Sequence, residues 1–147
     1  MPDIVHELQI EASPQNVFDV INSATGERGF WTDQTEYEAR VGSVAMFGFG
    51  PDAETKFHFQ VDAMDAPRTL EWTCVDGPPE WKGTRIRWLL EPADGGATRV
   101  RFEHLGWGSA DGALASCNFT WARILQRLDT LVTKGESNPV FAGGAYG

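Results

Sequence analysis

Residues that commonly build metal and redox sites are scarce in this chain. It holds 2 cysteines and 3 histidines among 147 residues, and none stands at the spacing of a metal-ligand motif. Cys74 and Cys117 lie far apart in the sequence, at positions that face inward in the expected elements. We therefore expect structural thiols, with no disulfide, no metal and no cofactor.

Long hydrophobic runs and an excess of basic residues are also missing. No apolar stretch approaches the roughly 20 residues that a membrane-spanning helix needs. The chain carries 12 Lys and Arg against 21 Asp and Glu, which gives a net charge of −9. Nucleic acids and anionic membranes attract basic surfaces, so we expect neither as a partner. The N-terminus has no basic-then-apolar signal layout, and this favours a cytoplasmic protein.

The sequence also lacks the motifs of nucleotide binding and of nucleophilic catalysis. It has no P-loop, no GxGxxG and no Gly-x-Ser-x-Gly elbow. The sequence therefore offers no signature of either function.

Two strands are indicated by alternation with a period of two between residues 84 and 105. The turn Asp94-Gly95-Gly96 between them is typical of a hairpin. His104 shares a face with apolar residues, so the pattern places a titratable ring on the covered side of the sheet. The residues expected to face inward are Ile86, Trp88, Leu90, Val100, Phe102 and His104.

A long amphipathic helix is predicted to close the domain. Apolar residues recur at three- and four-residue intervals from Leu114 to Val132, which makes one stripe. Asp111 or Ser109 is expected to cap its start, and Gly135 suits its end. A helix with one apolar stripe after a meander of strands should lie across the concave face of the sheet.

The rest of the chain predicts an opening strand over 4–12, a helix from Pro14 to about Asn22 and a short helix near 24–31 that Gly26 and Gly29 break. Further strands are expected over 35–40, 43–48, 57–63 and 70–75. Residues 136–147 form a tail that composition predicts to be mobile. Val140 and Phe141 in its middle are apolar enough to dock, either on their own domain or on a neighbouring subunit.

Three segments resemble the START-like, helix-grip superfamily (the SRPBCC group), and within it the small bacterial proteins related to the C-terminal domain of the activator of the heat-shock-90 ATPase. The first is the turn Ala12-Ser13-Pro14 into a helix. The second is the strand end His104-Leu105-Gly106, and the third is the closing helix with Trp121 and Leu125 on its inner stripe. The resemblance covers about residues 3–134.

This resemblance implies an α+β, helix-grip (Bet v 1-like) fold. In that fold a bent antiparallel sheet wraps around a long C-terminal helix, and two short helices follow strand one. We expect one domain over residues 1–135 and a tail over 136–147. The fold leaves a cavity between sheet and helix, and aromatic walls suit a flat apolar ligand.

Candidate ligand-binding residues follow from the inward positions. The alternative is that the tryptophans, 6 in this chain, simply fill the core. His104 is either a core-edge histidine with its hydrogen bonds satisfied, or a hydrogen-bonding or acid-base group for a ligand. His6 is expected near it, because the first and last strands pair in this fold. The candidates are Phe59, Trp72, Trp88, Phe102, His104, Trp121, Leu125 and His6.

Features outside the cavity are also predicted. Trp31 and Trp81 are expected on loops near the cavity mouth, where Trp81 either gates entry or packs on its own hairpin. Arginines on the outer face of the last two strands should pair with acidic neighbours such as Glu71 and Glu103.

Three functions stay open. The first is binding of a small hydrophobic or aromatic molecule. The second is a cyclase, hydratase or hydrolase type of enzyme that uses His104. The third, which the resemblance implies, is a chaperone co-factor with a part in the stress response. A free antiparallel edge and a docked tail also make a homodimer plausible.

Overall fold

Seven strands and three α-helices follow one another along residues 2–143, the part of the chain that the computed structural model describes. The strands are β1 (Ile4–Ile10), β2 (Gln34–Glu36), β3 (Val44–Phe49), β4 (Thr55–Asp65), β5 (Thr69–Asp76), β6 (Arg85–Pro92) and β7 (Thr98–Leu105). The helices are α1 (Pro14–Ile21), α2 (Ala24–Phe30) and α3 (Ala113–Lys134).

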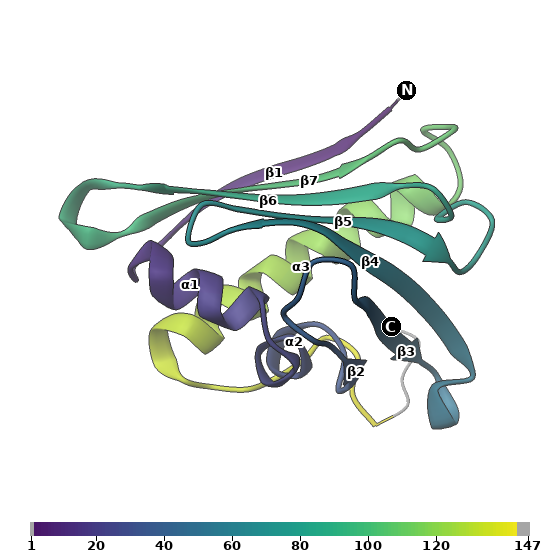
Figure 1. Cartoon of the computed structure of the whole chain (residues 1–147), viewed down its shortest axis with the longest axis horizontal. Helices are drawn as coiled ribbons and strands as arrows, with labels where there is room; N and C mark the ends of the chain where they lie inside the picture. The colour runs from purple at the N-terminus through teal and green to yellow at the C-terminus, as the bar shows by residue number, and fades with distance from the viewer. Residues whose placement is uncertain (1, 144–147) are drawn as a thin grey trace.

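The strands form one antiparallel sheet in the order β1-β7-β6-β5-β4-β3-β2. The opening strand therefore pairs with the last strand, and α1 and α2 span the distance from β1 to the opposite edge. Figure 1 shows α3 running along one face of the sheet, with α1 and α2 on the same side. This arrangement confirms the predicted helix-grip fold.

Local sequence rules account for most of these elements. Along β6 and β7 the residues predicted to face inward, His104 included, are at most 2% exposed. On α3 the fully buried residues are Trp121, Ile124, Leu125 and Leu128, which share the predicted stripe. Helix α1 begins with Pro14 after Ser13, whose hydroxyl accepts a hydrogen bond from the backbone N–H of Asn16 at 3.2 Å.

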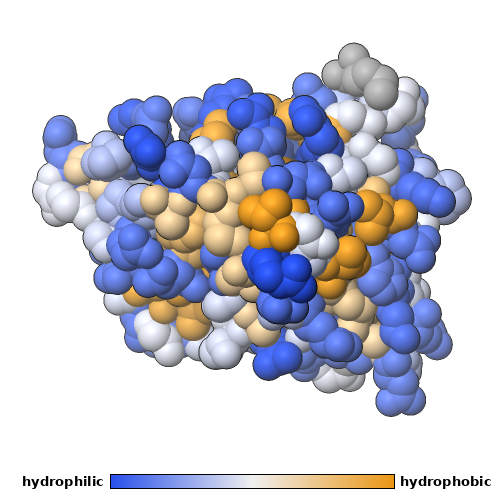
Figure 2. Space-filling model, viewed as in Figure 1, coloured by the Kyte–Doolittle hydropathy of each residue, from blue (hydrophilic) through white to orange (hydrophobic). Residues whose placement is uncertain are grey.

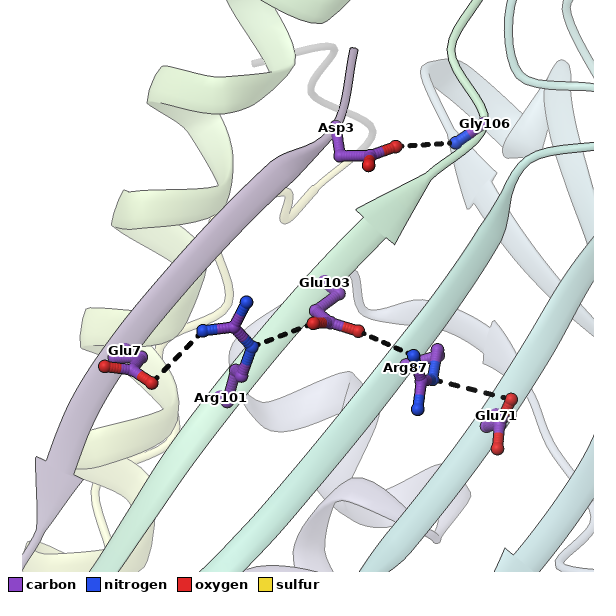
Figure 3. A network of polar contacts seen from close by, with 7 residues as sticks. All are labelled: Asp3, Glu7, Glu71, Arg87, Arg101, Glu103 and Gly106. Atoms are coloured by element: carbon purple, nitrogen blue, oxygen red, sulfur yellow. Dashed lines mark hydrogen bonds and ion pairs between the residues drawn. The ribbon is translucent and has the colours of Figure 1, made fainter. Parts of the chain in front are cut away.

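Charged side chains on the outer face of the sheet form a continuous chain of ion pairs (Figure 3). Glu103 is the central acid, and it accepts from Arg87 at 3.1 Å and from Arg101 at 2.8 Å. Arg101 also reaches Glu7 at 3.3 Å, and Arg87 lies 3.6 Å from Glu71. The predicted pairing of the outer arginines with acidic neighbours is confirmed for Arg87, Arg99 and Arg101. It links four adjacent strands on the side away from α3.

The predicted cap of α3 was wrong. Neither Asp111 nor Ser109 caps the helix, and Gly112 stands at the N-cap without a side-chain bond. Instead Glu80, from the loop between β5 and β6, accepts a hydrogen bond from the backbone N–H of Ala113 at 3.0 Å. A carboxylate at a helix N-terminus is favourable because the unpaired N–H groups there carry partial positive charge. The cap therefore joins two segments that the sequence separates by about 30 residues.

Two other expectations need correction. The strand expected over 35–40 is limited to β2, and the short helix α2 runs unbroken through Gly26. Gly26 is required by packing: a Cβ there would lie 1.8 Å from the carbonyl oxygen of Val20 on α1. The glycine lets the two short helices approach each other closely.

Residues 136–143 of the tail dock on their own domain, and residues 144–147 lie outside the described part of the chain. The backbone N–H of Phe141 donates to the carbonyl of Trp31 at 2.9 Å, and the N–H of Asp33 donates back to the carbonyl of Phe141 at 3.1 Å. Phe141 is only 8% exposed. Of the two possibilities that the sequence left open for Val140 and Phe141, the structure has the intramolecular one.

Most of the surface in Figure 2 is hydrophilic, and a few hydrophobic groups gather near the middle of that face. The large hydrophobic residues that remain exposed are Val5, Val41, Val44, Val75 and Phe119.

Replacing Trp88 by alanine should cost about 3–5 kcal/mol of unfolding free energy, because Trp88 is fully buried and a large cavity would remain. Cys74→Ala removes one sulfur atom from an equally buried site and should cost less. Urea unfolding of the two variants beside the parent protein measures both values. A smaller loss for Trp88→Ala than for Cys74→Ala would contradict the packing described.

Candidate functional site

His104 connects the sheet to α3 through hydrogen bonds on both of its ring nitrogens. The indole N–H of Trp121 donates to Nδ1 at 3.1 Å, and Nε2 lies 2.8 Å from the hydroxyl of Thr84. An indole can only donate, so Nδ1 accepts and the proton of the neutral ring is on Nε2. Nε2–H then donates to Thr84, whose hydroxyl donates to the carbonyl of Trp81 at 2.6 Å.

This environment keeps His104 neutral. The residue is fully buried, and burial lowers the pKa of its imidazole to about 3. A ring with two occupied nitrogens and such a low pKa is a poor general base near neutral pH. Its geometry matches the satisfied core-edge histidine, with a threonine hydroxyl and an indole as partners.

The other predicted site residues on the strands pack against one another. Trp88 and Phe102 have ring centroids 4.9 Å apart, and Phe102 lies 4.3 Å from Trp121 on α3. Trp72 joins them, 6.2 Å from Trp88 and 6.1 Å from Phe59. Edge-to-face and tilted contacts of this kind stabilise an aromatic core. Leu125, on the inner stripe of α3, is 3% exposed.

His6 is a diagonal neighbour of His104 on the β1–β7 pair, because His6 lies opposite Phe102 and Ile4 lies opposite His104. It pairs with Phe102 across the β1–β7 ladder, and its Nε2 is 3.3 Å from the backbone carbonyl of Asn118 on α3. The two histidines share no hydrogen bond among the described residues. Each histidine therefore makes its own contact between the sheet and α3.

A pocket of about 280 Å³ opens between the first half of α3 and the far strands of the sheet. Its walls come from β3, β4, the loop before β6, α3 and the tail. Aromatic rings make up most of the lining, and no lining side chain is an acid, an amine or an imidazole. The lining residues are Trp31, Phe49, Thr55, Phe57, Trp81, Ser116, Cys117, Thr120, Trp121, Ile124 and Phe141.

Of the eight candidate residues, the structure places Trp121 alone in this lining. The loop tryptophans expected near the cavity mouth, Trp31 and Trp81, do line the pocket. Trp81 also packs against His104, with ring centroids 4.7 Å apart. Sequence reasoning missed the contribution of Phe141, because nothing in the tail composition shows where it docks.

Three of the polar groups in the lining lie on α3, and Thr55 of β4 adds a further hydroxyl. Ser116, Cys117 and Thr120 supply two hydroxyls and a thiol. Burial raises the pKa of the Cys117 thiol to about 11, so the group is a neutral thiol rather than a nucleophilic thiolate near neutral pH. The lining therefore offers neutral hydrogen-bonding groups beside a large aromatic surface.

The family model described as "Activator of Hsp90 ATPase homolog 1-like protein" matches residues 11–133. The chain belongs to this family. The match includes β2–β7 and the pocket residues on α3 and β4. It agrees with the resemblance to the START-like superfamily that the sequence showed. No curated protein matches the sequence.

Solved structures agree with this assignment. The Aha1 dimer from Colwellia psychrerythraea is 29% identical, covers 93% of this chain and 100% of its own, and superposes with a TM-score of 0.83. The protein MLL2253 from Mesorhizobium loti is 18% identical over 92% of this chain and 99% of its own, with a TM-score of 0.79. CalU16 from Micromonospora echinospora is 13% identical over 90% of this chain and 77% of its own, with a TM-score of 0.73. The last two show the shared fold alone.

Residues 2–143 meet neither the requirements for a metal site nor those for a membrane-spanning helix. No group of three or more His, Cys, Asp or Glu side chains there could hold a metal ion. None of the helices in that range is long and apolar enough to cross a membrane.

One buried acid within the family match was not foreseen. Glu27 on α2 is fully buried, and neither carboxylate oxygen has a hydrogen-bond partner among the described residues. Burial raises the pKa of this carboxyl well above 4.5. The pKa of Tyr37 is also raised, mainly by burial and further by the charge of Glu27. Glu27 does not line the pocket.

The sequence carried an indirect signal for this burial in the glycines around Glu27. A Cβ at Gly26 would clash with α1, and a Cβ at Gly29 would lie 2.7 Å from Cδ2 of Leu131 on α3. Helix α2 therefore packs closely against both α1 and α3. This close packing buries Glu27, although a glutamate on a short polar helix is normally exposed.

Glu27→Gln should change how stability depends on pH. Because the folded-state pKa of Glu27 is raised, the parent protein loses stability as pH rises above about 4.5, where the unfolded chain ionises first. The glutamine variant lacks this loss, so its advantage in melting temperature should grow with pH. A tenfold difference in proton affinity between the folded and the unfolded chain corresponds to about 1.4 kcal/mol of stability.

The measurement is a set of thermal melts of both proteins from about pH 4.5 to 8. Glu36→Gln is the matched control, because Glu36 is an exposed glutamate on β2. Parallel curves for the parent and Glu27→Gln would show that Glu27 is not held in its protonated form.

Proposed function

We propose that the protein binds a small, uncharged aromatic molecule in the pocket between α3 and β4. The observation that carries this proposal is the lining of the pocket, which joins aromatic rings with neutral hydroxyl and thiol groups. Concave, mostly apolar sites with a few polar groups are typical of small-molecule binding. This matches the prediction from the sequence, although most of the rings that line the site differ from those predicted.

The lining favours uncharged ligands. A charged group loses its hydration when it is buried, and the cost is offset only where an opposite charge is at hand. The lining residues supply none. A phenolic O–H, by contrast, can donate to the hydroxyl oxygens of Ser116 and Thr120, whose own protons are donated to backbone carbonyls of α3.

The size of the pocket further limits the class of ligand. A dry cavity of about 150 Å³ accommodates benzene, and this pocket measures about 280 Å³. A fused two-ring compound with one polar oxygen is therefore the best match. 1-Naphthol is a simple probe of that description.

An enzymatic role through His104 has less support. Both of its ring nitrogens are engaged, its pKa is lowered to about 3, and it does not line the pocket. A chaperone co-factor role, cytoplasmic location and part in the stress response rest on the family description and on the sequence, and they stay predictions.

A homodimer also stays a prediction. The protein from Colwellia psychrerythraea is described as a dimer, and it is 29% identical to this chain. In this chain β1 is an edge strand of 7 residues, and its free edge is available for pairing.

Binding is tested by titrating 1-naphthol and following tryptophan fluorescence, since Trp31, Trp81 and Trp121 line the pocket. We expect saturable quenching by 1-naphthol. Binding of 1-naphthoate should be weaker by roughly tenfold or more, because its carboxylate gains no partner.

Thr120→Trp should abolish the binding by filling the pocket. Thr133→Trp is the matched control: both threonine hydroxyls donate to the carbonyl four residues earlier on α3, but Thr133 is exposed near the helix end. Equal binding by the two variants, or no saturable response of the parent protein to 1-naphthol, would contradict the proposed site.

A further inference from the structure

The C-terminal strap, which we define as residues 136–143, returns from the end of α3 and passes along the end of α2. The match to the family model ends at residue 133, before the strap begins. The strap nevertheless supplies Phe141 to the lining of the pocket. One wall of the proposed binding site therefore comes from a segment outside the matched range.

Backbone hydrogen bonds hold the strap in place. The last carbonyls of a helix have no partner within the helix. Here the carbonyl of Gly29 accepts from the N–H of Asn138 at 3.0 Å, and the carbonyl of Phe30 accepts from the N–H of Val140 at 3.2 Å. The strap thus satisfies carbonyls at the end of α2 that would otherwise need water.

Side chains fix both ends of the strap. Arg127 on α3 donates to the carbonyl of Asn138 at 2.7 Å, and the carboxylate of Asp33 accepts from the N–H of Gly143 at 3.0 Å. Between these points Phe141 pairs with Thr32 in a short parallel bridge. The ring of Phe141 is therefore held at a defined position.

At that position Phe141 closes one side of the pocket. Its ring meets Phe49 of β3 edge-to-face with centroids 4.8 Å apart. Phe49 in turn packs on Trp31 at 6.0 Å and on Phe57 at 5.0 Å, and all three line the pocket. The strap thus completes an aromatic wall opposite α3.

We propose that the C-terminal strap sets the size of the ligand, with Phe141 as the residue that determines specificity. This inference rests on the proposed function of the same pocket. The range that matches the family model supplies α3, β3 and β4, and the strap adds a wall that limits how far an aromatic ligand extends toward α2. Shortening the side chain at position 141 enlarges the pocket, and lengthening it makes the pocket smaller.

The test compares two probes that carry the same hydroxyl on different ring systems, 1-naphthol and 1-hydroxypyrene. The parent protein should bind 1-naphthol and bind 1-hydroxypyrene at least tenfold more weakly. Phe141→Ala should reverse or erase this preference by gaining affinity for 1-hydroxypyrene. Phe141→Trp should weaken 1-naphthol binding at least tenfold.

Val140→Ala is the matched control, because Val140 is a half-buried neighbour on the same strap that does not line the pocket. It should keep the preference of the parent protein. Thermal melts of each variant show whether it is folded, and the two substitutions at position 141 act in opposite directions, so a general loss of structure cannot produce both results.

Two outcomes would overturn the inference, and they are distinguishable. If the parent protein binds 1-naphthol and both Phe141 variants keep its preference, the strap does not set ligand size while the proposed function stands. If the parent protein binds neither probe, the proposed function fails and the role of the strap fails with it.

Discussion

The hydrogen bond from the indole of Trp121 to Nδ1 of His104 is the contact on which the rest of the structure depends. It ties α3 to the last strand of the sheet inside an apolar core, where an unpaired indole or imidazole nitrogen would be costly. It also fixes the ring as the Nε2–H form, which directs the second hydrogen bond to Thr84 and from there to the carbonyl of Trp81. A single polar chain thus runs from the helix through the sheet to the loop before β6.

This series of hydrogen bonds positions two walls of the pocket, because Trp121 and Trp81 stand at its ends and both residues line the pocket. The loop is held a second time by Glu80, which caps the first turn of α3. His104 therefore bears on the pocket through Trp121 and Trp81, and it does not itself line the pocket. A titratable residue on the covered face of the sheet thus stays uncharged while it links two residues of the pocket lining.

Much of the fold could be predicted because its signals are local. The alternation of residues 85–105, the stripe of α3 and the Ser13-Pro14 start of α1 each depend on near neighbours, and they lead to the family fold. The site was harder to predict. Period-two patterns show which residues face inward, but they do not show which of these fill the core, as Trp72 and Trp88 do, and which leave space. The burial of Glu27, the docking of Phe141 and the cap from Glu80 all depend on contacts between distant segments, which the composition of each segment does not reveal.

His104 is a neutral link between the sheet and α3, with its proton on Nε2. Nitrogen NMR of the protein with labelled histidine can test this, because the two ring nitrogens have distinct shifts in each tautomer and in the charged form. We expect an Nε2–H tautomer for His104 that persists as pH falls from about 7 to about 4, consistent with a pKa near 3. Protonation of His104 near its ordinary pKa of 6.5, or a proton on Nδ1, would contradict the link between α3 and the sheet and the pocket that it holds in place.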